Sequence, residues 1–205
     1  MPEGPEVWIL AQAVRQVPSY ESVFSHNKQL VLPHLNQVWS FGLTGTVALE
    51  EGRLIKRNSG FLPGSICEGE FNEPTTSVAW MTASREELQE MVHRRFETSR
   101  KALGALLLDQ NLIGGIGVAW GSELLFRLKL RPEVSAKRQN LEELALQLVQ
   151  LRSEVQELYQ TVLAQGPAQA FTNGWYHNLY ASREPLLQVY KKGEPIQVYG
   201  RTWWV

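Results

Sequence analysis

The stretch LLLDQNLIGGIGVAWGSELLF, residues 106–126, decides how the second half of the chain is organised. It contains three glycines within four positions, between two apolar runs. Glycine permits tight turns and close approach of backbone amides to a ligand, and the helix expected from Val118 would attract anions at its start. The loop Asp109–Gly117 therefore indicates either a phosphate-binding turn between two helices or an ordinary interhelical turn that needs positive φ.

Helical patterns flank this loop on both sides. Ser84 followed three residues later by Glu87 is a capping box, and it predicts that a helix begins there. Further helices are expected from about Thr98 to Leu108 and from about Val118 to Leu128. A long amphipathic helix is expected over residues 141–163, where leucine and valine recur at helical spacing.

The first part of the chain has a different character. Pro5 is placed as the first residue of a helix that would run to about Val17. Residues 29–80 then show short apolar or alternating runs broken by glycine and proline, which is typical of β structure. We therefore expect an α+β fold, with a leading helix and a β-sandwich-like domain ahead of the helical domain.

The last residues predict a hairpin-like ribbon. Gln188–Tyr190 and Ile196–Tyr199 alternate in polarity, and Lys192–Pro195 lies between them as a turn. The basic residues of this ribbon are Lys191, Lys192 and Arg201. With the change of character near Ser84, the pattern divides the chain into residues 1–82, 83–182 and 183–205.

Composition bounds the class of protein. The 205 residues are 43% hydrophobic, as in a globular chain, and no apolar run approaches the about 18 residues of a membrane span. One cysteine and four histidines show no metal-ligand spacing, so no metal or cofactor is expected. No secretory signal is visible, so we expect an intracellular protein.

The net charge of −1 conceals an uneven distribution. Residues 85–138 and 183–205 are net positive, whereas residues 1–80 and 139–182 are net negative. This suits a local phosphate-binding face, although ordinary variation among solvated faces gives the same pattern.

The opening MPEGPEV has two interpretations. Pro5 can simply begin a helix behind a frayed end. Alternatively, removal of Met1 exposes Pro2 as a secondary amine that is partly neutral near pH 7 and can attack an electrophilic carbon, with Glu3 moving protons beside it. The tripeptide alone does not decide between the two.

Two further positions have a structural and a functional interpretation. Lys28 precedes a strand-like run, and a lone lysine in a loop is usually solvated. The turn Phe41–Gly45 carries Leu43 at its tip, which can be part of a core or a wedge inserted into a base stack.

The order of these elements, rather than any one of them, resembles the formamidopyrimidine-DNA glycosylase / endonuclease VIII family. The opening hexapeptide and residues 106–126 carry the resemblance most specifically, and the tail resembles that family's C-terminal finger. The resemblance implies a bifunctional DNA glycosylase and abasic-site lyase of base excision repair. Its fold would combine a β-sandwich and a helix–two-turn–helix domain, with damaged DNA bound between them.

The resemblance also implies roles for individual residues. Pro2 is the nucleophile at C1′, Glu3 is the acid that assists base release, and Lys28 contacts a phosphate and supports catalysis. Leu43 fills the gap left by the flipped nucleotide, and Arg201 grips phosphate. Further DNA contacts are implied for the glycine-rich loop, at Gln110, Asn111, Gly115 and Gly117.

The sequence departs from the family in several ways. The finger cysteines are missing, which indicates a zincless finger. Val118 replaces an asparagine that contacts phosphate, and a void-filling Arg-Arg-Phe-Gly loop has no counterpart. The segment between the first helix and Lys28 is short. We therefore expect weak discrimination of the opposite base and tolerance of single-stranded DNA. The zincless finger and the Leu-Thr-Gly turn resemble the endonuclease VIII side of the family more closely, which implies oxidised pyrimidines and hydantoins as substrates.

Two alternatives remain. A non-catalytic nucleic-acid-binding protein on the same scaffold would explain Val118 but not the combination of Pro2, Glu3 and Lys28. A small-molecule enzyme with an N-terminal proline, such as a tautomerase, would leave the glycine-rich loop unexplained. We expect a monomer that acts on single- or double-stranded DNA without a membrane or a cofactor.

Overall fold

The computed structural model describes residues 4–5, 8–9 and 12, four strands between residues 29 and 57, and residues 78–165 and 184–205. The strands and helices of the first half are β1 (Gln29–Leu32), β2 (Gln37–Ser40), β3 (Thr46–Glu50), β4 (Arg53–Arg57), β5 (Val78–Ala79) and α2 (Arg85–Phe96). Those of the second half are α3 (Leu103–Leu107), β6 (Ile113–Gly114), α4 (Val118–Arg127), η2 (Ala136–Arg138), α5 (Leu141–Ala164), η3 (Glu184–Leu186), β7 (Pro195–Val198) and β8 (Arg201–Trp204).

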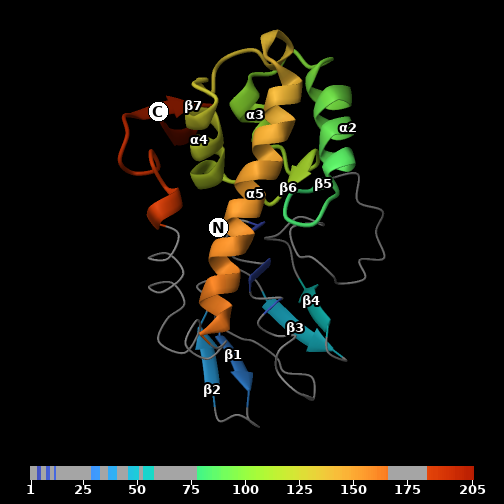
Figure 1. The fold of residues 1–205 in the computed structure, drawn as a ribbon, viewed down its shortest axis with the longest axis vertical. Coiled ribbons are helices and arrows are strands. Elements are labelled where there is room, and N and C mark those ends of the chain that lie inside the picture. Colours follow the sequence, from blue (N-terminus) through green and yellow to red (C-terminus); the bar gives the residue numbers. More distant parts are fainter. Residues whose placement is uncertain are drawn as a thin grey trace.

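The molecule is elongated, and α5 runs along most of its length. Helices α2, α3 and α4 lie around one end of α5, and strands β1–β4 lie toward the other (Figure 1). The structure therefore has a mixed α and β architecture, as the sequence predicts.

Two antiparallel strand pairs represent the β-rich part. β1 pairs with β2, with Gln29 opposite Ser40, and β3 pairs with β4, with Thr46 opposite Arg57. These pairs confirm β structure within residues 29–80, where the sequence predicts it. The β-sandwich-like arrangement stays a prediction. Of the predicted helix over residues 5–17, the described positions 5, 8, 9 and 12 are helical, and the rest lies outside the described residues.

Helix α2 begins where the capping box predicts. The Ser84 hydroxyl accepts from the Glu87 amide at 3.0 Å, and the Glu87 carboxylate accepts from the Ser84 amide at 2.7 Å. Both bonds satisfy amides that a helix start otherwise leaves unpaired. The buried face of α2 packs on α5 and consists of Leu88, Met91, Val92 and Phe96.

Helix α5 supplies the apolar stripe on which the core is built. Its 24 residues bury a set at helical spacing: Leu141, Leu144, Ala145, Leu148, Leu151, Val155, Tyr159 and Leu163. Trp80, fully buried, donates its indole N–H to the Leu148 carbonyl oxygen at 3.0 Å and lies 6.2 Å from the Trp120 ring. Among the described residues, no helix is long and apolar enough to cross a membrane.

Polar side chains of α5 bind residues 80–83, which join the β-rich part of the chain to the helical part. Arg152 donates to the carbonyl oxygens of Trp80 and Ala83, and Gln156 donates to that of Met81 at 2.9 Å. Burial lowers the pKa of the Arg152 guanidinium. The same segment contributes β5, which pairs in parallel with β6 so that Val78 lies opposite Ile113. The connection is therefore fixed on the helical part.

The helix predicted from Thr98 to Leu108 is shorter than expected. Only residues 103–107 are helical, because Ala102 is extended and forms an isolated bridge with Ser135. The Leu103 amide donates to the Val134 carbonyl oxygen at 2.8 Å, which ties the start of α3 to a segment distant in sequence. A contact of this kind leaves no local sequence signal.

The C-terminal hairpin exists, but with different strands from those predicted. β7 pairs with β8, with Val198 opposite Arg201, and the turn is Tyr199–Gly200. Gln188–Tyr190 is not a strand, because its three amides donate to the carboxylate of Glu123 and not to a partner strand. The predicted pairing of Gln188–Tyr190 with Ile196–Tyr199 is therefore wrong.

Trp203 fastens the hairpin to the helices. It is 1% exposed, and a Cβ placed on Gly104 of α3 or on Gly121 of α4 would lie 2.9 or 3.0 Å from its ring. Glycine at both positions thus leaves the space that the indole occupies.

We expect Trp203→Ala to lower the free energy of unfolding by about 3–5 kcal/mol, because it empties a fully buried site between α3 and α4. Urea denaturation measures this. Trp204→Ala, which removes a half-buried ring packed edge-on against Tyr190 at 4.8 Å, is the matched control and should lose less. Equal losses would show that Trp203 does not fasten the hairpin.

Candidate nucleic-acid interface

The glycine-rich loop is held in shape by Gln110. Its side-chain N–H donates to the Ile116 carbonyl oxygen at 2.6 Å, and its side-chain oxygen accepts from the Gly115 amide at 2.9 Å. Both ends of the amide group are thus engaged within the loop. The structure gives Gln110 a shaping role, and its predicted contact with DNA stays a prediction.

Asn111 lies exposed at the outer edge of the same loop. Its backbone and side-chain N–H groups lie 3.2 and 3.4 Å from the Asp109 Oδ1 atom, to which they donate. The other oxygen of Asp109 accepts from Lys101 at 3.2 Å. The Asn111 side chain is therefore exposed, and its hydrogen bond to Asp109 orients it.

The N-terminal segment is seated directly on the loop. The Gly4 amide donates to the Gly115 carbonyl oxygen with an N···O distance of 2.6 Å. Gly115 has φ +94°, and a Cβ on it would lie 2.9 Å from the Gly4 Cα. A Cβ on Gly4 would in turn lie 3.0 Å from Gly115 and 3.2 Å from Met81. Two glycines are thus required for the two backbones to meet.

The loop ends at Gly117, which is the N-cap of α4 and is extended. Gly117 has no side chain with which to cap the helix, and Val118 is the first helical residue. The backbone there follows the loop that carries Gly115, so the loop and the positive end of the helix dipole face the same region.

Helix α4 also carries the hairpin, through a buried carboxylate. Glu123 is 0% exposed and accepts from the backbone amides of Gln188, Val189 and Tyr190 at 2.8, 2.9 and 2.7 Å. Three amides directed at one carboxylate replace the water that burial removes. The chain entering the hairpin is therefore fixed to the middle of α4.

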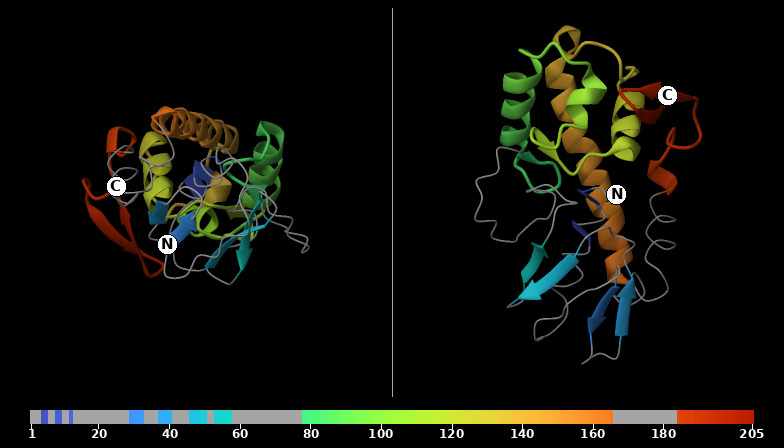
Figure 2. Two further views of the ribbon diagram at one scale, coloured as in Figure 1. Left: turned by 90° about the horizontal axis from the view of Figure 1, so that it is seen from below. Right: turned by 180° about the vertical axis from the view of Figure 1, so that it is seen from behind.

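Ser122 adds a second attachment on the neighbouring position. Its hydroxyl accepts from the Trp204 amide at 3.2 Å, at the end of β8. The hairpin lies beside α4 in all views (Figures 1 and 2). Helix α4 thus begins at the glycine-rich loop and holds the hairpin along its side, which makes the loop and the hairpin parts of one rigid unit.

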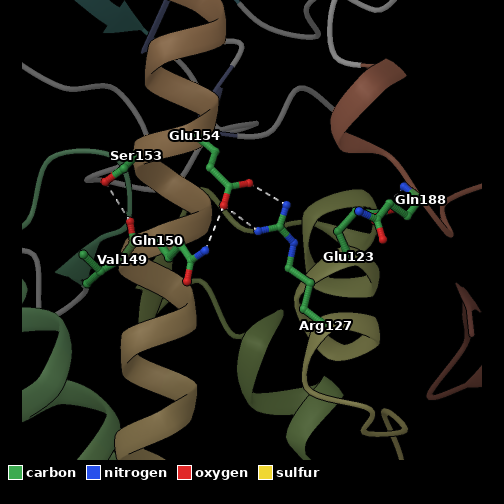
Figure 3. Close-up of polar contacts among 7 residues, drawn as sticks. All are labelled: Glu123, Arg127, Val149, Gln150, Ser153, Glu154 and Gln188. Carbon is green, nitrogen blue, oxygen red and sulfur yellow. Dashed lines mark hydrogen bonds and ion pairs between the residues drawn. The ribbon is translucent and has the colours of Figure 1, made fainter.

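An ion pair fixes the far end of α4 to α5. Both terminal nitrogens of Arg127 donate to Glu154, at 3.0 and 2.7 Å, and Gln150 donates to the same carboxylate at 3.1 Å (Figure 3). The hydrogen bond from Arg127 is the main reason that the pKa of Glu154 lies below its ordinary value, against a smaller opposing effect of burial.

Arg201 lies on the surface of the hairpin. It is the first residue of β8, next to the turn, and is exposed. The other predicted cations of the ribbon differ from it. Lys192 donates to the Leu187 carbonyl oxygen at 2.6 Å and lies 2.7 Å from Glu184, whereas Lys191 lies 5.5 Å from the Tyr190 ring.

The predicted residues thus fall into two groups. The structure brings Gln110, Asn111, Gly115 and Gly117 together in one loop, and α4 connects this loop to the hairpin that carries Arg201. The DNA contacts of these residues stay predictions. Pro2, Glu3, Lys28 and Leu43 lie outside the described residues. Within the described part of the chain, no group of three or more His, Cys, Asp or Glu residues is placed to hold a metal ion.

Glu123 and Gly4 are important positions that the sequence analysis missed. A signal for Glu123 exists, since it is the only charged residue among the first nine of a helix that reads VAWGSELLF. Gly4 carries no such signal, because its need for glycine comes from a contact with a residue more than 100 positions away.

Comparison with known families identifies the helical part. Residues 81–167 match the model described as the formamidopyrimidine-DNA glycosylase H2TH domain. This match confirms, over the helical part, the resemblance that the sequence indicates. No curated protein matches the chain.

Solved structures of Lactococcus lactis formamidopyrimidine-DNA glycosylase share limited similarity with the chain. The wild-type enzyme in complex with DNA containing an oxidised pyrimidine is 23% identical, with a TM-score of 0.41 over 57% of this chain and 44% of that one. The same enzyme bound non-covalently to DNA with an abasic site is 19% identical, with a TM-score of 0.42 over 59% and 43%. The chain thus spans less than half the length of these relatives.

Gly115→Ala should separate the N-terminal segment from the loop. The new Cβ would meet the Gly4 Cα and would also be strained at positive φ. Gly200→Ala is the matched control, since Gly200 has φ +70° and nothing within 4 Å of its Cβ position. We expect the control to lose about 1 kcal/mol of stability, and Gly115→Ala about 1–3 kcal/mol more. Denaturation measures both, and equal losses would contradict a required close approach.

The ion pair between Arg127 and Glu154 predicts a pH dependence of stability. Because the pKa of Glu154 is lowered in the folded state, its contribution is present above its ordinary value of 4.5 and is lost as the pH falls through the folded value. Glu154→Gln should therefore cost about 1 kcal/mol near pH 7 and progressively less below about pH 4.5.

The exposed Glu157 on the same helix provides the control, since Glu157→Gln leaves this ion pair intact. Denaturation at several pH values gives both differences. A cost for Glu154→Gln that stays constant down to pH 3 would exclude the ion pair as its source.

Proposed function

We propose that the chain is a DNA-repair glycosylase, because residues 81–167 match the model of the formamidopyrimidine-DNA glycosylase H2TH domain. It removes oxidised bases, with oxidised pyrimidines and hydantoins preferred, and nicks the strand at the resulting abasic site. The observation that carries this proposal is the hydrogen bond from the Gly4 amide to the Gly115 carbonyl oxygen.

That hydrogen bond limits where the N-terminal amine can lie. Pro2 is two residues from Gly4, and two residues of extended chain span at most about 7 Å. Once Met1 is removed, the Pro2 amine is therefore held near the loop that our proposal assigns to phosphate binding. A nucleophile and an anion site this close together suit a reaction on a nucleotide within a strand.

The proposed reaction needs no group beyond the chain and its substrate. The Pro2 nitrogen forms a bond to C1′ as the bond from C1′ to the base breaks, and Glu3 supplies a proton that assists base release. The C1′–O4′ bond then breaks as O4′ takes up a proton and the Pro2 nitrogen loses its own, which leaves an iminium between Pro2 and C1′. This iminium acidifies the C2′ hydrogen, whose loss expels the 3′ phosphate by β-elimination. Loss of the 5′ phosphate by δ-elimination can follow, and water releases the sugar fragment from Pro2.

The remaining residues position the strand in this proposal. Backbone groups of the loop from Asn111 to Gly117 contact phosphates, while Gln110 keeps the loop in shape. Arg201 holds a phosphate from the hairpin side, and Lys28 does so near the lesion. Leu43 fills the space of the flipped nucleotide. We assign the chemistry to residues 1–82, strand binding to residues 83–182 and the hairpin contact to residues 183–205, in an intracellular monomer.

The experiment is strand cleavage under single-turnover conditions. With an oligonucleotide that contains a preformed abasic site, Pro2→Gly should nick much more slowly, because a primary amine without the proline ring replaces the secondary amine, and Glu3→Gln should retain most of the activity. With an oxidised pyrimidine instead, both variants should fail, because base release also needs the acid. Mass spectrometry of the purified protein checks that Met1 is removed.

Trp204→Ala serves as a control for general damage, since it changes neither the amine nor the loop. Nicking at the wild-type rate by Pro2→Gly would contradict the proposed nucleophile. Intact DNA binding without any nicking by the wild-type protein would instead favour a non-catalytic nucleic-acid-binding protein on the same scaffold.

A further inference from the structure

The turn of the C-terminal hairpin has an unusual composition for its geometry. Tyr199 and Gly200 form the two-residue loop between β7 and β8 and have φ +52° and +70°. Two-residue hairpin loops with positive φ at both positions strongly favour Asn-Gly, Asp-Gly or Gly-Gly. A bulky residue at positive φ is uncommon because its Cβ crowds the backbone.

Among the residues that the structure describes, no contact of the Tyr199 side chain offsets this strain. The Tyr199 side chain is 70% exposed, the highest value among the large hydrophobic residues described as exposed. In the part of the chain that the structure describes, its ring makes no hydrogen bond or ring contact. Asparagine would satisfy the turn better, so the reason for tyrosine lies outside the folded chain.

The surroundings of the ring indicate what it contacts. Gln197, Gly200 and Arg201 beside it are all exposed, so the ring is one aromatic surface among polar groups and not part of an apolar patch. A protein partner normally needs a contiguous apolar area. An aromatic ring beside an exposed guanidinium is the combination with which proteins bind single-stranded nucleic acid, by stacking on a base and contacting its phosphate.

We propose that Tyr199 is a stacking platform for an unpaired nucleobase, next to a phosphate that Arg201 holds. This inference rests on the proposed function, since it assumes that the hairpin meets DNA. It adds a base contact on the strand flanking the lesion, and it would favour single-stranded or locally opened DNA.

The hairpin is rigid enough to present such a platform. Gln197 donates to the Thr202 hydroxyl across the strands at 2.7 Å, and the Trp204 amide donates to Ser122 on α4. Glu123 binds the chain that enters the hairpin, as described above, and Trp203 is buried between α3 and α4. Little conformational freedom is therefore lost when a base stacks on Tyr199.

The test is binding of a lesion-free, fluorescently labelled single-stranded oligonucleotide, measured by anisotropy at several salt concentrations. Tyr199→Asn should weaken binding at least about fivefold, the value of the weaker base–aromatic stacks. Its melting temperature should not fall, because asparagine suits positive φ. Tyr199→Phe, which keeps the stacking surface, should bind within about twofold of the wild type.

Arg201→Ala separates the electrostatic contribution. It should reduce the slope of log affinity against log salt by about 0.7, whereas Tyr199→Asn should leave the slope unchanged. The effect of Tyr199→Asn should also be smaller on a fully paired duplex, whose bases are already stacked.

Unchanged binding by Tyr199→Asn, or equal weakening by Tyr199→Phe, would overturn the stacking proposal. If Arg201→Ala still weakened binding in that case, the proposed function would stand without this inference. If the wild-type protein bound no DNA at all, both would fail together.

Discussion

The close approach of two glycines, Gly4 and Gly115, is the constraint on which the rest of the structure depends. One hydrogen bond of 2.6 Å joins their backbones, and a Cβ on either would collide with the other. Gln110 holds the Gly115 side of this contact in shape with two hydrogen bonds. The N-terminal segment, distant in sequence from the helical part, is thereby positioned by backbone groups that no side chain can replace.

Helix α4 connects the glycine-rich loop to the C-terminal hairpin and to α5. It begins directly after the glycine-rich loop. Its Glu123 holds the chain that enters the C-terminal hairpin through three hydrogen bonds to backbone amides, and its Ser122 holds the hairpin itself through one. Arg127 at its other end is paired with Glu154 of α5. The N-terminal segment, the loop and the hairpin are thus all attached, directly or through the loop, to one helix, as the proposed binding of a single DNA strand requires. Attachment to this one helix explains how a chain of 205 residues keeps the N-terminal segment, the loop and the hairpin in fixed relative positions.

Features governed by local physics could be predicted from the sequence, and those governed by distant contacts could not. The Ser84 capping box and the apolar stripe of α5 were both predictable, because a cap and a helical period are visible within a few residues. The start of α3 depends on Ser135, and Gln188–Tyr190 is removed from the hairpin by Glu123. Neither pairing partner is near in sequence. Residue type and order predicted a glycine-rich loop before a helix and an arginine in the C-terminal ribbon, and the structure has both, while their DNA contacts stay predictions. The role of Glu123 depends on what α4 packs against, which the sequence does not show.

The measurement that tests the account most directly is reductive trapping followed by peptide mapping. Borohydride reduces an iminium between an amine and an abasic-site sugar to a stable covalent bond, which marks the amine that attacked C1′. We predict a protein–DNA adduct whose sugar remnant lies on the N-terminal peptide at Pro2, which would link the segment seated on Gly115 to the reacting nucleotide. An adduct on a lysine elsewhere, or no adduct with a strand that the protein demonstrably binds, would contradict the account.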